Sequence, residues 1–276
     1  TMTGEPPFGA MRPSPAQERA RAIAQHLPAS YAGRKLASLF LGLAGGRQKR
    51  AFDVNIFRGQ KARLHPFDNI CEKRVYLTPQ LWDPQERAFL SQYIASLTSP
   101  DFFFADIGAN VGLYTLFARG ETLHAGKTFR AICVEPDPEM RARLMQNIAF
   151  SDAQGEVTVL PFAATVAPAR LRFTINRESR GMSHIAPDGE IEVEGRSLLS
   201  LLESAPRIDA MKIDIEGHEY AALAAFFANA PRALWPRLLM METSHESNER
   251  SASRLAIGAG YRPALNTGLN TLSVLD

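Results

Sequence analysis

The segment from Asp106 to Gly112, with the spacing D-x-G-x-N-x-G, constrains the fold of this chain more than any other feature. It follows the apolar run 102–105, which predicts a buried strand, and precedes 113–118, which predicts a helix. A strand that turns through glycines directly into a helix is typical of α/β proteins that hold a nucleotide-like ligand at the turn. The residues of the turn that we expect to contact this ligand are Asp106, Gly108, Asn110 and Gly112.

The acid at the start of the turn indicates which ligand is bound. A dinucleotide-binding fold presents bare backbone to a pyrophosphate, so it uses G-x-G-x-x-G with no negative charge nearby. A carboxylate at Asp106 would repel a pyrophosphate and would suit a cationic ligand. S-adenosylmethionine carries a sulfonium and an ammonium group and has no phosphate, so we expect it as the cofactor.

From residue 101 onward, predicted strands alternate with predicted helices. The expected strands are 102–107, 130–135, 156–163, 208–215, 237–243, 261–265 and 271–275, and the expected helices are 111–119, 138–149, 197–203, 218–228 and 248–258. This alternation predicts an α/β fold with a doubly wound, mostly parallel sheet. Residues 169–194 interrupt it with two further strands, 171–175 and 191–194, around a polar loop, which predicts a small β-hairpin.

We divide the chain into an N-terminal helical arm, residues 1–50, and a main domain, residues 51–276. Residues 1–13 are rich in Gly and Pro and are expected to be disordered. Ser14-Pro15-Ala16-Gln17 has the pattern of a capping box and predicts a helix that stops near Leu27. A second helix is expected over 31–43, and the apolar residues on one of its faces are Leu36, Leu39, Phe40 and Leu43.

The second predicted helix and the residues after it are basic, through Arg34, Lys35, Arg47, Lys49 and Arg50. A helix on a membrane surface and a contact with RNA are both compatible with this pattern. We favour a third interpretation, in which the basic residues form the solvated face of a helix packed against the main domain.

Residues 51–100 are expected to form a hairpin and a helix before the core of the main domain, residues 101–276. The alternation of apolar and polar residues predicts short strands at 54–57 and 74–77. Asp83-Pro84-Gln85-Glu86 predicts a helix start, with Asp83 as the cap and Glu86 reaching back to it. The apolar face of that helix is formed by Phe89, Leu90, Tyr93, Ile94 and Leu97.

Composition sets the broad class of protein. The 276 residues are 45% hydrophobic and 22% charged, which is typical of a soluble globular protein. A formal net charge of +2 argues against nucleic acid as the default partner. Cys71 and Cys133 are far apart and lack metal-ligand spacing, so we expect free thiols in a reducing, cytoplasmic compartment. Neither a transmembrane segment nor a signal peptide is expected.

Further polar or small residues follow the predicted second and third strands. Glu135 comes 23 residues after Gly112 (135 − 112), where an acid is expected to accept hydrogen bonds from ribose hydroxyls, and Pro136 follows it directly. The small residue Ala163 would let an adenine ring lie against the backbone. Because ligands of open α/β sheets bind outside the carboxyl ends of the strands, we expect Glu135, Pro136 and Ala163 to contact the cofactor.

The fourth and fifth strands supply the candidate catalytic residues. Strand alternation places Lys212, Asp214 and Glu216 on one side of the fourth strand, with Lys212 expected to pair with Asp214. The fifth strand ends at Glu242, with His245 in the loop beyond it. The candidate bases are, in order, His245, Asp214 and Glu242. An alternative role for the acids is to hold Mg²⁺ or another divalent metal, with Asp214, Glu216 and Glu242 as ligands.

Three strings of the sequence resemble the FkbM family of S-adenosylmethionine-dependent methyltransferases. They are 106–112, Glu135-Pro-Asp-Pro138 with Asn147 downstream, and Lys212-Ile-Asp-Ile-Glu-Gly-His-Glu219, and residues 54–98 resemble the short elements that precede the first string. The resemblance implies a Rossmann-like class I methyltransferase fold of seven strands with the last antiparallel. It also implies O-methylation of a hydroxyl on a sugar, glycolipid or polyketide-type product. One departure is Arg196-Ser197-Leu198, where family members carry a Leu-Asp pair.

Two other classes of function stay open at this stage. A nicotinamide-dependent oxidoreductase would share the strand, turn and helix, although the missing G-x-G-x-x-G and the acid at Asp106 count against it. A non-catalytic adaptor that retains the fold is the other alternative. The methyl acceptor, a small molecule or glycan with a hydroxyl group, is expected to meet loops 176–190 and 243–247.

Overall fold

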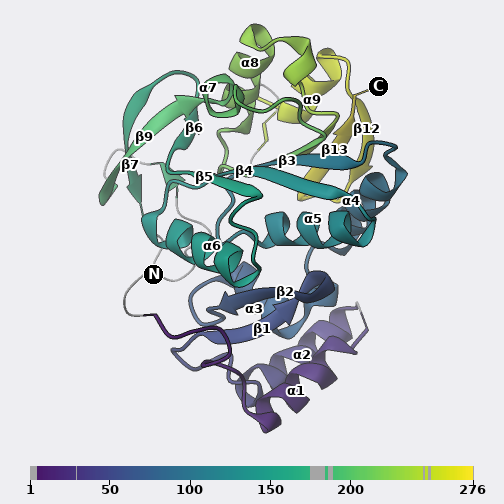
Figure 1. Cartoon of the computed structure of the whole chain (residues 1–276), viewed down its shortest axis with the longest axis vertical. Helices are drawn as coiled ribbons and strands as arrows, with labels where there is room; N and C mark the ends of the chain where they lie inside the picture. Colours follow the sequence, from purple (N-terminus) through teal and green to yellow (C-terminus); the bar gives the residue numbers. More distant parts are fainter. Residues whose placement is uncertain are drawn as a thin grey trace.

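The computed structural model describes residues 5–28, 30–174, 184–185, 189–244, 246–247 and 250–275. A central sheet separates two helical layers, and a smaller N-terminal body lies beyond one of these layers (Figure 1). Helices α4 (Pro84–Ser96), α5 (Leu113–His124) and α6 (Pro138–Phe150) cover one face of the sheet. Helices α7 (Leu198–Leu202), α8 (Glu219–Asn229) and α9 (Ala252–Gly258) cover the other.

Seven strands of the described residues form the central sheet. In spatial order they are β12 (Arg262–Asn266), β13 (Asn270–Val274), β11 (Leu238–Glu242), β10 (Ala210–Ile213), β3 (Asp101–Ile107), β4 (Thr128–Val134) and β5 (Val157–Leu160). The last strand, β13, runs antiparallel to both of its neighbours, while β11, β10, β3, β4 and β5 pair in parallel. The expectation of a doubly wound, mostly parallel sheet with an antiparallel last strand is therefore confirmed.

The sheet has a hydrophobic core on each face because side chains alternate along its strands. In β3, Phe102 and Phe104 belong to the core beneath α4 and α5. Phe103, Ala105 and Ile107 belong to the core beneath α7 and α8. The polar side chains of β3, Asp101 and Asp106, consequently lie near the two ends of the strand, where they can be solvated or can meet a ligand.

The expected third strand, 156–163, was wrong as a single element. Strand β5 ends at Leu160, and the chain resumes as β6 (Ala163–Thr165) in a separate four-stranded sheet. Pro161 lies at the break, where its lack of an N–H group prevents the ladder from continuing. The other strands of this sheet are β9 (Ile191–Ser197), β7 (Ala169–Thr174) and β8 (His184–Ile185).

The predicted hairpin is confirmed, since β7 and β9 pair antiparallel. Most of the polar loop between its strands, the loop assigned to the methyl acceptor, lies outside the described residues.

The N-terminal body contains two helices, a two-stranded sheet and a third helix. They are α1 (Pro15–Gln25), α2 (Tyr31–Leu43), β1 (Phe52–Ile56), β2 (Gln60–Leu64) and α3 (Ile70–Leu77). The predicted capping box is present, since Ser14 and Gln17 each accept a hydrogen bond from the other's backbone N–H. The expected strand at 74–77 was wrong, because these residues end α3.

Residues 5–13 are fixed in place, which overturns the expectation of disorder for this part of 1–13. The carboxylate of Asp53 in β1 accepts hydrogen bonds from the backbone N–H groups of Gly9 and Met11. Arg63 in β2 donates to the carbonyl oxygens of Pro6 and Pro7. The segment thereby lies along the β1–β2 sheet.

Among the described residues, none of the helices combines the length and the hydropathy needed to cross a bilayer.

Candidate functional site

A cavity of about 240 Å³ lies at the carboxyl edge of the sheet. It lies where β3 and β10 are neighbours and the order of successive strands reverses, the place where open α/β sheets bind ligands. One wall comes from the ends of β3, β4, β10 and β11 and the start of α5. The opposite wall comes from the N-terminal body and the approach to α4, through Ile70, Cys71, Trp82 and Asp83.

The turn after β3 brings backbone groups to the floor of the cavity. Gly108 has φ +79°, and any Cβ there would overlap the backbone oxygen of Asp214. Only glycine therefore lets the turn approach β10 so closely. Asn110 is also left-handed, with φ 51°, and its side-chain oxygen lies 3.0 Å from Nδ2 of Asn69.

Glu135, the candidate ribose ligand, is buried at the end of β4. Its two carboxylate oxygens accept hydrogen bonds from the backbone N–H groups of Asn110 (2.7 Å) and Asp137 (2.8 Å). Burial raises the pKa of Glu135 to about 7, and these hydrogen bonds oppose the shift. Glu135 thus joins the turn after β3 to the start of α6 while it lines the cavity.

Asp106 and Lys212 lie side by side in the register of β3 and β10. Asp106 is 1% exposed and accepts a hydrogen bond of 2.6 Å from the hydroxyl of Thr115. Burial raises the pKa of Asp106, and the positive charge of Lys212 opposes this. Lys212 Nζ lies 2.7 Å from Oδ2 of Asp214, so the expected ion pair is present. Burial lowers the pKa of Lys212, but the charges of Asp214 and Asp106 outweigh it and hold that pKa above its ordinary value.

Glu242, at the end of β11, meets Asp214 across the strand ends. Burial and then the negative charge of Asp214 raise the pKa of Glu242 to about 7. Carboxylate oxygens of Asp214, Glu219 and Glu242 lie within 4.8 Å of one another. Glu219, from α8, is thus the third acid of this cluster, where the sequence analysis expected Glu216. Glu216 instead lines the cavity from the turn after β10.

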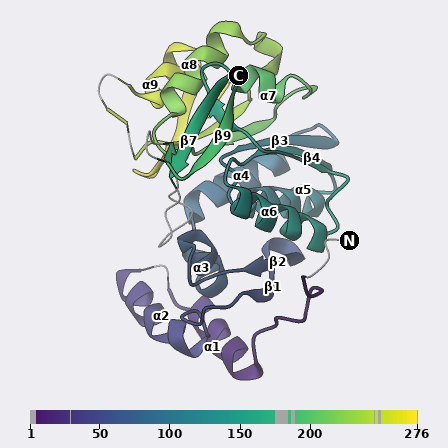
Figure 2. The ribbon, with the colours of Figure 1, turned by 90° about the vertical axis from the view of Figure 1, so that its left-hand side faces the viewer.

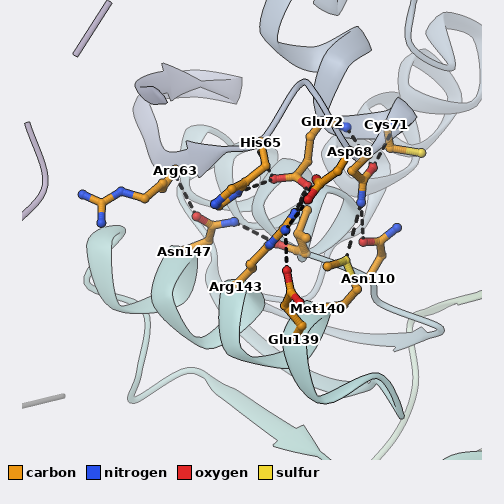
Figure 3. Close-up of polar contacts among 12 residues, drawn as sticks. Arg63, His65, Asp68, Cys71, Glu72, Asn110, Glu139, Met140, Arg143 and Asn147 are labelled. Carbon is orange, nitrogen blue, oxygen red and sulfur yellow. Dashed lines mark hydrogen bonds and ion pairs between the residues drawn. The ribbon is translucent and has the colours of Figure 1, made fainter. Parts of the chain in front are cut away.

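The wall from the N-terminal body is held against the turn by Asn69. The side-chain oxygen of Asn69 caps α3 by accepting from the N–H groups of Cys71 and Glu72, while its amide reaches Asn110 and the sulfur of Met140 (Figure 3). The sequence analysis missed this helix, although Asn69 followed by Glu72 three residues later is a helix-start pattern. Burial raises the pKa of the Cys71 thiol to about 12.

Asp83 is placed differently from its predicted capping role. It has φ 41° and makes no side-chain cap of α4, and Glu86 bonds instead with Thr267 and Asn270. The carboxylate of Asp83 accepts a hydrogen bond of 2.8 Å from the hydroxyl of Tyr114 at the cavity wall. Burial raises the pKa of Asp83, so its environment disfavours the charge.

The structure brings most of the predicted site residues to one cavity. Those that line it are Asp106, Gly108, Asn110, Glu135, Pro136, Ala163, Asp214, Glu216 and Glu242. Gly112 is not among the lining residues. It begins α5 with φ 82°, and a Cβ there would overlap the side chain of Leu144. His245 lies outside the described residues.

The lining is strongly acidic. Seven of the described lining residues are acids and one, Lys212, is a base; the acids are Asp83, Asp106, Glu135, Asp137, Asp214, Glu216 and Glu242. Such a lining favours a cationic ligand over a phosphate.

Comparison with known proteins assigns the family. A family model described as the methyltransferase FkbM domain matches residues 106–253. This match covers more than half of the chain and includes both the turn after β3 and the acids after β10 and β11. The fold is that of the Rossmann-like class I methyltransferases. The chain belongs to the FkbM methyltransferase family.

Solved structures give distant matches. A methyltransferase FkbM from Methylobacillus flagellatus KT is 20% identical, with a TM-score of 0.45, over 75% of this chain and 55% of that one. An O-methyltransferase from Bacillus cereus is 11% identical, with a TM-score of 0.42, over 70% and 82% of the two chains. The present chain therefore spans little more than half of the length of the Methylobacillus protein. No curated protein matches the sequence.

Proposed function

We propose that this chain binds S-adenosylmethionine in the cavity between β3 and β10 and transfers its methyl group to a hydroxyl acceptor. The observation that carries the proposal is the acidic cavity at the strand-order reversal, formed largely within the segment that matches the FkbM domain. S-adenosylmethionine supplies a methyl group on a positively charged sulfur, which is a good leaving group. The task left to the protein is to position donor and acceptor in line.

The residues present fit this cofactor. The turn after β3 presents the backbone of Gly108 to the cavity with no side chain between it and a ligand. The oxygens of Glu135 keep lone pairs beyond their two backbone hydrogen bonds, so they can accept hydrogen bonds from ribose hydroxyls. Asp106 and Asp214 offer negative charge to the ammonium and sulfonium groups of the cofactor. Pro136 and Ala163 would lie beside its adenine ring.

The proposed acceptor is a hydroxyl on a sugar, glycolipid or polyketide-type product, and its proton needs a base. Glu242 suits this role because its pKa of about 7 lets it gain or release a proton near neutral pH. Asp214 is less suited, since its ion pair with Lys212 favours the charged carboxylate. His245, which the sequence analysis ranks first, also stays a candidate, and it lies outside the described residues.

The Lys212 ammonium also bears on the metal alternative. It lies 2.7 Å from Asp214, where it supplies positive charge to the same carboxylates that would hold Mg²⁺. We therefore favour methyl transfer without a metal, and we expect turnover to persist when EDTA is added. Loss of turnover in EDTA with recovery on added Mg²⁺ would assign the carboxylates to a metal instead.

Isothermal titration calorimetry tests the proposal against the two alternatives. Micromolar binding of S-adenosylmethionine with no response to NAD is the expected result, and binding of NAD would instead support an oxidoreductase. Asp106→Ala should abolish cofactor binding, because Lys212, buried beside Asp106, would then present its positive charge to the cationic ligand with one acid fewer to offset it. A protein that binds neither ligand would contradict the proposal. Binding without methyl transfer to any hydroxyl substrate would favour the adaptor.

A further inference from the structure

Helix α2 exposes its large apolar side chains. Leu36, Leu39 and Leu43, spaced three and four residues apart and so on one face, are 49%, 69% and 67% exposed. The face that α2 buries is made of small residues, Gly33, Ala37 and Ala44. Four of the ten exposed large apolar side chains of the described residues lie on α1 and α2; they are Ile23, Leu36, Leu39 and Leu43.

The small residues explain why the leucines face outward. A Cβ at Gly33 would overlap the backbone oxygen of Pro28, so α2 approaches the end of α1 too closely for a larger side chain. The leucine side chains lie outside this buried face and are exposed. The apolar face that the sequence analysis noted is thus not used to pack against the main domain, apart from the partly buried Phe40.

Basic residues lie on α2 and in the segment directly after it. Residues 30–52 contain five basic residues and no acid; the basic residues are Arg34, Lys35, Arg47, Lys49 and Arg50. All five are exposed. The concentration is local, because the whole chain has 31 basic and 29 acidic residues.

The helix lies apart from the cavity. Helices α1 and α2 form the end of the molecule farthest from α8 and α9 in both views (Figures 1 and 2). The first residue of the chain that lines the cavity is Ile70. A second function of α2 would therefore leave the cavity unobstructed.

We propose that the leucine face of α2 docks onto the surface of a bilayer that contains anionic lipids. A helix with leucines on one face and Lys or Arg beside them lies in the interface, with its apolar face among the acyl chains and its cations among the headgroups. Leu36, Leu39 and Leu43 enter the bilayer, and the five basic residues meet lipid phosphates and carboxylates. The chain is held at the surface and does not cross the membrane.

Charge complementarity selects the bilayer over two other occupants. A second copy of the chain would bring two sets of the same basic residues together in a symmetric contact, which is unfavourable. RNA would complement the charge but would leave three leucines in water. An anionic bilayer satisfies both the apolar and the basic residues.

Cosedimentation of the full chain with vesicles tests the proposal. We expect binding to vesicles of phosphatidylcholine with phosphatidylserine, and weak binding to phosphatidylcholine alone. The double variant Leu39→Ser/Leu43→Ser should lose roughly tenfold or more in partitioning, because two leucines no longer enter the bilayer. Its matched control is Ile257→Ser/Leu269→Ser, which removes two other apolar side chains that are at least half exposed and should bind as the unmodified chain does.

Four results would overturn the proposal. The first is failure of the unmodified chain to bind either vesicle. The second is equal binding by the leucine variant and its control. The third is a dimer in analytical ultracentrifugation that the leucine variant alone dissociates, which would assign the face to a second copy. The fourth is binding of RNA that is equally tight for the unmodified chain and the leucine variant, which would assign this region to RNA instead of a bilayer.

Discussion

At the scale of single residues, the cavity depends on a few backbone positions that only certain side chains tolerate. Gly108 permits contact between the turn after β3 and the end of β10, which brings Asp106 and Asp214 to one site. Burial there, and then the negative charge of Asp214, raise the pKa of Glu242 to about 7. The close approach of the turn to β10 therefore restricts position 108 to glycine and also brings the carboxyl groups together.

Gly108→Ala should destabilise the protein by about 2–4 kcal/mol, because the new Cβ overlaps Asp214 and alanine disfavours φ +79°. Cofactor affinity should fall with it. Urea denaturation and calorimetry measure the two effects. Gly155→Ala is the control, since a Cβ at Gly155 meets nothing within 4 Å, and near-equal losses in the two variants would contradict the steric argument.

Glu242→Gln should flatten the dependence of stability on pH. An acid with a raised pKa holds its proton more tightly in the folded protein than in the unfolded chain, so stability falls as pH rises. For Glu242 the fall spans its ordinary value of 4.5 and its folded value of about 7. Glutamine resembles the protonated acid and lacks this fall. The test is the free energy of unfolding of both proteins at about pH 5 and about pH 8. An equal change between the two pH values in both proteins would refute the raised pKa of Glu242.

At the scale of elements, α3 connects the N-terminal body to the cavity. Its N-terminal residues line the cavity, and Asn69 caps the helix with one end of its amide and holds Asn110 with the other. The alternation seen at 74–77 predicted a strand, yet the cap at Asn69 and the packing of Val75 and Tyr76 into the core stabilise a helix. Tertiary contacts outweighed the local pattern here.

Two substitutions of Asn69 separate the helix cap from the contact with the turn. Asn69→Ser retains a capping oxygen but is too short to reach Asn110, so stability should change little while cofactor affinity falls about fivefold. Asn69→Ala loses the cap as well and should cost about 1 kcal/mol more in stability. The measurements are urea denaturation and calorimetry. Unchanged affinity in both variants would remove Asn69 from the positioning of the turn.

At the scale of the whole molecule, buried ion pairs join the N-terminal body to the core. Arg143 of α6 contacts Asp68 (2.7 Å) and Glu72 (3.0 Å), as Figure 3 shows.

Another buried ion pair lies within the N-terminal body. Arg63 of β2 contacts Asp53 of β1 at 2.7 Å, and both side chains are almost fully buried. Burial would raise the pKa of Asp53, but Arg63 and the N–H groups of Met11 and Gly9 outweigh it and lower that pKa.

Asp53→Ala should destabilise the protein by about 3–5 kcal/mol, because the buried Arg63 keeps its charge and loses its buried carboxylate partner, with only the exposed Glu5 left to pair with it. Residues 5–13 should then become accessible to proteases, since Asp53 accepts hydrogen bonds from Gly9 and Met11. Thermal denaturation and limited proteolysis measure these effects. The control is Glu192→Ala, which breaks an exposed ion pair with Arg170 and should change stability by less than about 0.5 kcal/mol.

The sequence alone determined the central sheet and most of the cavity lining. The strands of that sheet are buried on both faces, so their apolar runs and the glycine turn after Asp106 were visible without tertiary information. Strand ends in a parallel sheet must meet at one edge. That geometric constraint allowed Glu135, Asp214 and Glu242 to be grouped from their positions in the chain.

Only the tertiary structure decided the wall opposite the sheet and whether the apolar face of α2 is buried. Ile70, Trp82 and Asp83 reach the cavity through contacts between distant segments, which no local pattern encodes. The leucines of α2 had the spacing of a packed helix face, but the helix buries Gly33 and Ala37 instead and leaves the leucines exposed. Periodicity identifies an apolar face, whereas the space available beside the helix determines whether that face is buried.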